Sequence, residues 1–136
     1  MDTSNVCPNG WHVPAPMEWD SLMYFVGGPY WQTSSIITGL KLMETGIKAN
    51  GTGFWEKDIK ANNASGFSAR PGGTAMMSTQ WMFSGMGFEG NWWAGQGSNM
   101  YVRLDGNTGD VAMQTGSPSN AYSIRCVKGL PMVAKK

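Results

Sequence analysis

Residues 7–19 read CPNGWHVPAPMEW, and this stretch holds the only histidine, one of the two cysteines, two tryptophans and three prolines. Because proline fixes the backbone φ angle, the stretch predicts a rigid turn that leads into the first helix. Its residue types are compatible with a reactive site, a metal site or a structural clasp. We expect Trp11 and Trp19 to pack in the core, since indole is large and mostly apolar.

The two cysteines, Cys7 and Cys126, lie near opposite ends of the chain. Two thiols and one histidine do not supply a four-ligand zinc site with recognisable spacing, so we expect no metal and no cofactor. Three alternatives are open: a structural disulfide that joins the first and last elements, two buried free thiols, or a nucleophilic pair of Cys7 with His12. His12 is otherwise a hydrogen-bonded structural residue or a ligand. A disulfide would imply an oxidising compartment.

The length and charge of the chain narrow the class of protein. Its 136 residues fit a single domain, which we assign to residues 1–136, and its abrupt start predicts a module excised from a larger surface protein. The formal net charge is +1, only 14% of the residues are charged, and the basic residues are scattered. We therefore expect no nucleic-acid partner. No apolar run approaches the ~20 residues of a membrane span, so we expect no membrane insertion.

Two helices are predicted in the first third of the chain. Over residues 16–26, Trp19, Leu22, Met23 and Val26 form one apolar stripe at helical spacing, and Gly27-Gly28-Pro29 is a strong stop. A shorter helix is predicted over residues 34–44, although Gly39 disfavours it. Residues 45–66 are rich in glycine, asparagine and lysine, which predicts a long ordered surface loop.

The rest of the chain predicts short strands separated by turns. The sequence DGNTGD at 105–110 has the composition of a hairpin turn, and Asp105, Asn107 and Asp110 could alternatively ligate calcium. Two helices followed by an antiparallel sheet make an α+β domain. The predicted strands cover residues 67–70, 81–83, 92–94, 100–104, 111–114 and 121–127.

A series of aromatic residues and methionines is the strongest candidate for a recognition surface; its members are Trp81, Met82, Phe83, Met86, Phe88, Trp92, Trp93, Met100 and Tyr101. Part of the series should be core, because a half-buried strand exposes only one face. Large side chains on a glycine-rich loop, by contrast, can serve as anchors for a protein or as stacking platforms for a sugar. Together with the polar groups that would orient a ligand, the candidate ligand-binding residues are Trp81, Met86, Phe88, Glu89, Asn91, Gln96, Asn99 and Arg103.

Six segments in order resemble the Fibrobacter succinogenes major paralogous domain family over residues 7–129. They are CPNGWHVPAPMEWDSLMYFVGG, GLKL, GFSARPGG, NWWA, YVRL and YSIRCVKG. The resemblance implies a C-type-lectin-like fold, in which two helices flank a small twisted antiparallel sheet with long irregular loops and the first and last strands pair. It also implies that Cys7 and Cys126 form a bond that ties this terminal pairing together. Ala15 replaces the Ser or Thr usual at the helix N-cap, so the side-chain cap should be lost.

The resemblance implies a secreted or surface-anchored bacterial protein that lies outside the cytoplasm. We expect a non-enzymatic extracellular module that binds a protein or a glycan, because a single histidine and scattered carboxylates offer little for catalysis. The alternative is a structural or adhesive module of a large bacterial surface protein. Similar folds include variable proteins diversified by retroelements, which would confine differences between related genes to about residues 74–125.

Overall fold

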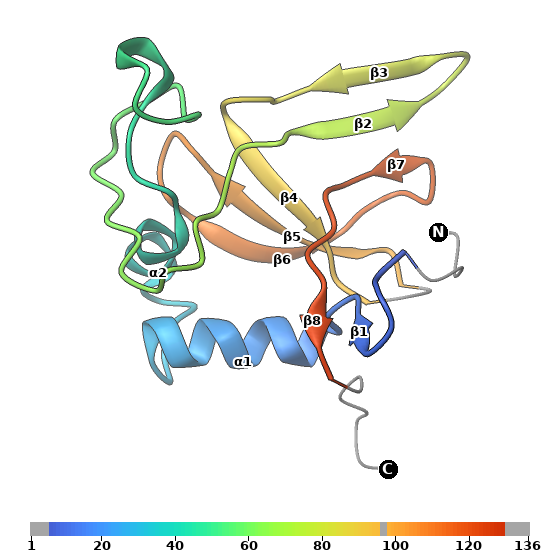
Figure 1. The fold of residues 1–136 in the computed structure, drawn as a ribbon, viewed down its shortest axis with the longest axis horizontal. Helices are drawn as coiled ribbons and strands as arrows, with labels where there is room; N and C mark the ends of the chain where they lie inside the picture. The colour runs from blue at the N-terminus through green and yellow to red at the C-terminus, as the bar shows by residue number, and fades with distance from the viewer. Residues whose placement is uncertain (1–5, 96–97, 130–136) are drawn as a thin grey trace.

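The computed structural model describes residues 6–95 and 98–129 and shows a mixed α/β domain (Figure 1). Within these residues there are two α-helices, one short 3-10 helix and three small antiparallel sheets. The elements are β1 Trp11–His12, α1 Pro16–Gly27, α2 Ser35–Leu42, η1 Lys48–Asn50, β2 Thr74–Met77, β3 Trp81–Ser84, β4 Glu89–Trp93, β5 Met100–Asp105, β6 Val111–Thr115, β7 Asn120–Ala121 and β8 Val127–Lys128.

The strands form the pair β1-β8, the sheet β3-β2-β7 and the sheet β4-β5-β6. The prediction of one small sheet is therefore wrong. Gly85 and Gly87 adopt positive φ angles of 75° and 90° between β3 and β4, which turns the chain so that β3 does not pair with β4. The predicted strand over 121–127 is also divided: after β7 only Ser123 bridges Trp92, before β8 begins.

The predicted strand over 67–70 is reduced to one isolated bridge between Ala69 and Met43. The reason lies at Ser68, which takes a left-handed φ of 56° that interrupts an extended backbone. Asn63 holds this conformation, because its side-chain oxygen accepts the Ser68 N–H at 2.9 Å and its amide nitrogen donates to the Ser68 hydroxyl at 2.8 Å. Local side-chain hydrogen bonds thus outweigh the strand tendency of this segment.

Both helices form where the apolar spacing predicts them. α1 buries Trp19 and Met23, and the side chain of Ala15 makes no cap hydrogen bond, as expected. Glu18 supplies half of a capping box instead, because its carboxylate accepts the Ala15 N–H at 2.8 Å. In α2, a Cβ at Gly39 would lie 1.7 Å from the carbonyl oxygen of Gly109, so glycine is required for the close approach of α2 to the β5–β6 turn.

The core lies between the helices and the inner face of the β4-β5-β6 sheet. Trp92, Val102, Leu104 and Val111 are buried there together with Trp19 of α1. Trp55 is 1% exposed and donates its indole N–H to the Ala69 carbonyl at 3.1 Å, which fixes the long 45–66 loop to the core. No helix of the described residues has the length and apolar character needed to cross a membrane.

Trp19 packs in the core as predicted, but the same prediction for Trp11 is wrong. Trp11 is 45% exposed, whereas its neighbour His12 is 7% exposed. Successive side chains of a strand point to opposite faces, and in β1 the histidine takes the inward position. The indole of Trp11 therefore faces outward.

Candidate functional site

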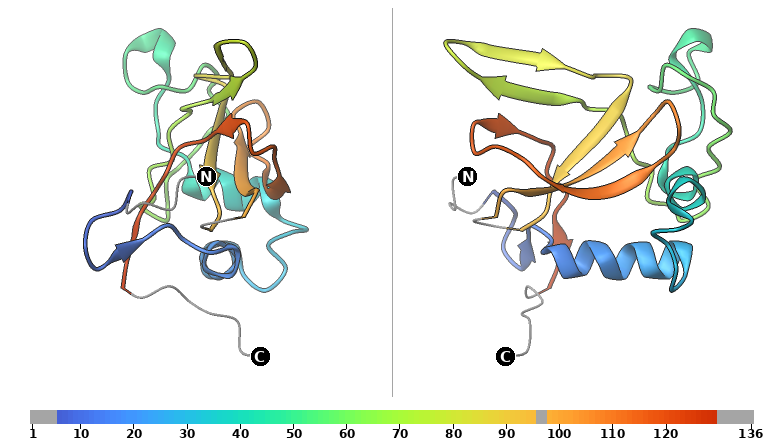
Figure 2. Two further views of the ribbon diagram at one scale, coloured as in Figure 1. Left: turned by 90° about the vertical axis from the view of Figure 1, so that its right-hand side faces the viewer. Right: turned by 180° about the vertical axis from the view of Figure 1, so that it is seen from behind.

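The β2–β3 hairpin projects from the end of the molecule that lies opposite α1 (Figures 1 and 2). All four residues of β3 are exposed, and Phe83 is 80% exposed. Met86, in the turn that follows, is 77% exposed. We call the exposed apolar side chains of this region the hairpin surface; they are Met76, Met77, Trp81, Met82, Phe83, Met86 and Phe88.

The register of β2 and β3 shows that the hairpin is apolar on both faces. Met77 pairs with Trp81 and Met76 pairs with Met82, and because side chains alternate, these two pairs point to opposite faces. The expectation that one face of these strands is core does not hold for β3. No charged residue occurs from Pro71 to Phe88, so the hairpin offers contact area without selecting a partner by charge.

β3 is also the edge strand of its sheet, since the order is β3-β2-β7. Natural proteins commonly protect such an edge with charged side chains or proline, and β3 has neither. Large apolar patches and unprotected edges on a folded domain are typical of surfaces that another molecule covers. This combination makes the hairpin surface the leading candidate site.

The base of the hairpin is held firmly to β4. The Gly73 N–H donates to the Glu89 carbonyl, and the Gly87 N–H donates to the Pro71 carbonyl, each at 2.9 Å. Asn91 donates its side-chain amide to the Thr74 hydroxyl at 2.9 Å and is only 1% exposed. Asn91 therefore lies beneath the surface and anchors β2, although the sequence placed it among the ligand-binding residues.

A polar face lies on the outer side of the β4-β5-β6 sheet, where the register aligns Glu89, Arg103 and Asp105 with Tyr101 and Gln114. Glu89 accepts a hydrogen bond from the Arg103 guanidinium at 2.8 Å, which raises the pKa of Arg103. Tyr101 donates to Gln114 at 2.8 Å. The structure thus brings together Glu89 and Arg103, two of the candidate residues, as an ion pair.

Two aromatic rings complete this polar sheet face. Tyr101 and Tyr122 are stacked with ring centroids 4.2 Å apart, and Trp93 and Tyr122 form a T-shaped pair with centroids 4.7 Å apart. Desolvation, followed by the neighbouring Tyr122, raises the pKa of Tyr101. The face offers polar groups on a rigid support next to the hairpin base.

The remaining candidate residues are dispersed. Trp81, Met86 and Phe88 belong to the hairpin surface, whereas Asn99 is exposed at the start of β5, where its carbonyl accepts the Gly116 N–H at 2.7 Å. Gln96 lies outside the described residues. Met82 and Phe83 belong to the aromatic and methionine series predicted for recognition, whereas Met76 and Met77 of the hairpin surface were not singled out from the sequence. The signal that could have found them is the long uncharged run between Arg70 and Glu89.

Around residues 7–19 the structure shows a clasp between the two ends of the described chain. Cys7 and Cys126 form a disulfide, which confirms that alternative over free or catalytic thiols, and β1 pairs with β8. The disulfide is typical of proteins outside the reducing cytoplasm. We use the term clasp for this disulfide, this strand pair and the His12–Glu18 contact.

His12 is a structural residue of the clasp. Its Nδ1 lies 2.8 Å from the Gly129 carbonyl and its Nε2 lies 2.8 Å from the Glu18 carboxylate, so both ring nitrogens face acceptors and the charged imidazolium fits. Burial lowers the pKa of His12, but the hydrogen bond and charge of Glu18 and the Gly129 carbonyl outweigh it and raise the pKa above its ordinary value.

The 105–110 loop is a hydrogen-bonded hairpin turn. The Asp105 side chain accepts the Asn107 N–H at 2.7 Å, and the Asp105 N–H donates to the Asp110 carbonyl at 2.9 Å. In the described part of the chain, no group of three or more His, Cys, Asp or Glu residues is arranged to hold a metal ion.

The segments that carry the family resemblance lie in the clasp, α1, α2, residues 66–73, β4 and β5. The family model described as Fibrobacter succinogenes major domain matches residues 1–128. The chain belongs to this family. Comparisons with curated proteins and with solved structures gave no match.

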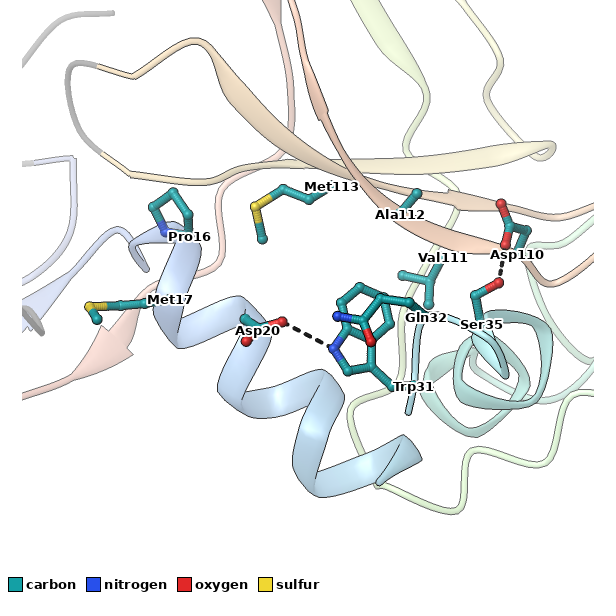
Figure 3. A pocket seen from close by; sticks show the side chains of 10 residues that line it. All are labelled: Pro16, Met17, Asp20, Trp31, Gln32, Ser35, Asp110, Val111, Ala112 and Met113. Atoms are coloured by element: carbon teal, nitrogen blue, oxygen red, sulfur yellow. Dashed lines mark hydrogen bonds between the residues drawn. The ribbon is translucent and has the colours of Figure 1, made fainter. Parts of the chain in front are cut away.

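This Fibrobacter succinogenes major domain also has an open cleft of about 570 Å³ between α1 and β6 (Figure 3). Asp20 accepts the Trp31 indole N–H there at 3.0 Å, and the Ser35 hydroxyl donates to Asp110. Both carboxylates therefore have structural partners across the cleft. None of the candidate ligand-binding residues lines it.

Proposed function

We propose that the domain is a non-enzymatic module that binds a protein ligand through the hairpin surface. The observation that carries the proposal is the exposure of seven large apolar side chains, five on the two faces of an uncharged hairpin and two in the segment that follows it. Covering a Phe or Met side chain stabilises a complex by roughly 1.5–3 kcal/mol relative to leaving it in water. A partner that encloses the hairpin would gain this stabilisation for each side chain that it covers.

The composition of the hairpin surface favours a protein over a glycan. Four of its seven members are methionines, whose flexible thioethers adapt to the irregular apolar surface of a protein. Sugar sites usually combine aromatic rings with several polar groups. The polar sheet face, with Tyr101 and the Glu89–Arg103 pair, has that character, so a glycan that contacts this face is the alternative ligand.

A binding role without catalysis agrees with the structural partners of the histidine, the cysteines and Glu89. The only histidine is engaged through both ring nitrogens in the clasp, and both cysteines form the disulfide. Glu89 is paired with Arg103 on the sheet face. These groups serve the fold, which leaves contact area as the main property of the exposed hairpin.

The proposal includes a C-type-lectin-like fold displayed on the bacterial surface or secreted. Three features support this fold: β1 and β8 pair as first and last strands, two helices pack on a sheet, and a long irregular region precedes the hairpin. The disulfide supports an extracellular location, because such bonds persist in oxidising environments.

The experiment that tests the proposal is an array of glycans and of host and microbial proteins, probed with three forms of the domain. The wild type should give a defined set of signals, and the Trp81→Ala/Phe83→Ser variant should lose them. The matched control is Tyr24→Ala/Phe25→Ser, which removes two aromatics on α1 that are 57% and 86% exposed. Equal signals from all three forms would reject the hairpin as the binding surface.

A structural or adhesive role is the second candidate, and the unprotected edge of β3 favours it. Such an edge can pair with a strand of another domain in a large surface protein. This role predicts that the sedimentation coefficient of the wild type rises with concentration and that the hairpin variant stays monomeric. Under that outcome the array would show no specific ligand.

A further inference from the structure

A second apolar cavity, separate from the hairpin surface, lies beside the clasp. It has a volume of about 400 Å³ and opens between the first half of α1 and the strand β8. Trp19, Leu22 and Phe67 line it, together with Trp11 and Val127. A volume in this range matches sites for small organic ligands rather than for a folded partner.

The walls of this clasp cavity are rigid and aromatic. Trp19 is 3% exposed, and its ring packs edge-on against Phe67 with the centroids 5.8 Å apart. Trp11, at 45% exposure, and Val127, at 37%, leave apolar surface open to solvent at the same cavity. The nearby Cys7–Cys126 bond fixes the strand that carries Val127. The cavity therefore has fixed walls and apolar surface that is exposed to solvent.

The charges at the cavity are asymmetric. Glu18 lines it, but its charge is compensated by His12 at 2.8 Å. Arg125 and Lys128 also line it, and in the described part of the chain neither forms an ion pair. Arg125 lies over the Phe67 ring at 4.1 Å from its centroid, which orients the guanidinium at the cavity. Two uncompensated cations therefore adjoin an apolar cavity.

We propose that the clasp cavity binds a small organic anion with an apolar body, of the class of aromatic or aliphatic carboxylates. The apolar body fills the space between Trp19, Phe67 and Val127, and the carboxylate is held by the planar fork of Arg125 with Lys128 nearby. A cationic ligand of the same shape is repelled by both groups. The formal net charge of the chain is only +1, so this selectivity comes from the local arrangement.

The test is a titration of the full chain with two probes of matched shape and opposite charge, 2-naphthoate and 2-naphthylmethylammonium. The signals followed are the indole N–H resonances of the tryptophans in two-dimensional NMR spectra. Naphthoate should shift the Trp11 and Trp19 resonances in a saturable manner and leave Trp81 unaffected. The cationic probe should bind at least about 5-fold more weakly, since it loses a charge-assisted contact and meets repulsion.

Charge variants locate the anion. Arg125→Gln should weaken naphthoate binding about 3- to 10-fold and Lys128→Gln about 2-fold, while Lys57→Gln, a charge removed from the exposed 45–66 loop, should have no effect. The Trp19 resonance of each free variant reports whether the cavity has kept its shape. If Arg125→Gln shifts the Trp19 resonance of the free protein, the conclusion rests on naphthoate binding by Lys128→Gln.

Three outcomes would overturn the proposal. They are equal binding of both probes, shifts that map to Trp81 instead of Trp11 and Trp19, and naphthoate binding that neither Arg125→Gln nor Lys128→Gln weakens. The hairpin variant Trp81→Ala/Phe83→Ser should bind naphthoate as the wild type does. The clasp cavity and the hairpin surface can therefore fail or succeed independently.

Discussion

The clasp and the hairpin surface differ in how many contacts they make with the rest of the domain. In the clasp, the disulfide, the β1-β8 pair and the His12–Glu18 contact join distant parts of the chain. In the hairpin, four consecutive residues of β3 are exposed and one edge of the strand is unpaired. We infer that stability resides at the clasp and core, and that the exposed hairpin contributes little to stability and remains available for the proposed recognition.

The largest effect is expected at the disulfide. The Cys7→Ser/Cys126→Ser variant should lose up to about 4–5 kcal/mol of unfolding free energy, because the bond closes a loop with a sequence separation of 119 residues. Urea denaturation of the variant and the wild type measures this loss. A loss below about 1 kcal/mol would show that the core alone holds the ends together.

Removal of Glu18 comes next. At pH 6, Glu18→Ala should cost about 3 kcal/mol, because it leaves the buried His12 charge and the Ala15 N–H without their partner. The matched control is Glu56→Ala, which removes the partner of Lys48 from an exposed pair and should cost under about 1 kcal/mol. Equal losses in the two variants would contradict a special role for the clasp pair.

The pH dependence of stability should follow His12. Because its pKa is raised in the folded state, the stabilisation is complete below the unfolded-state pKa of about 6.5 and is lost as the pH rises through the folded-state value. The loss amounts to about 1.4 kcal/mol for each unit by which the pKa is raised. Denaturation curves from about pH 5 to about pH 9, a range that includes the ordinary histidine pKa of about 6.5 and extends above it, should show this decline for the wild type. In His12→Gln it should be absent, and a decline of the same size in that variant would assign it to other groups.

The smallest effect on stability is expected at the hairpin. Phe83→Ser should change the unfolding free energy by no more than about 0.5 kcal/mol, because the side chain is 80% exposed. The same denaturation experiment gives the value. A loss above about 2 kcal/mol would mean that Phe83 packs in the folded domain, and the separation of stability from recognition would fail.

Much of the architecture follows from local sequence patterns. The apolar stripe of α1, the stop after Gly27 and the turn at 105–110 are short-range signals, and each formed where the sequence predicts it. The two cysteines by themselves leave three alternatives open, and the family resemblance implies the disulfide. Long-range pairing explains it, since β1 and β8 bring the two cysteines together.

The sequence predicted the site less completely, for physical reasons that differ between residues. Asn91 looks like a surface residue, but Thr74 and the base of β2 provide its hydrogen-bond partners in the interior. For Met82 and Phe83 the sequence left open whether they lie in the core or on the recognition surface, because a strand pattern does not tell which face is covered, and among the described residues both are exposed. In a strand of two residues, no alternation is long enough to tell that Trp11 faces outward and His12 inward.

The central claim is that the hairpin surface carries binding, whereas the clasp and core carry stability. Its most direct test compares the array signals of Trp81→Ala/Phe83→Ser and Tyr24→Ala/Phe25→Ser at equal amounts of folded protein. The account predicts that the hairpin variant loses at least about 10-fold of the wild-type signal, as for anchor residues at a binding surface, while the α1 variant retains it. Retention of the signal by the hairpin variant, or its loss in the α1 variant alone, would contradict the account.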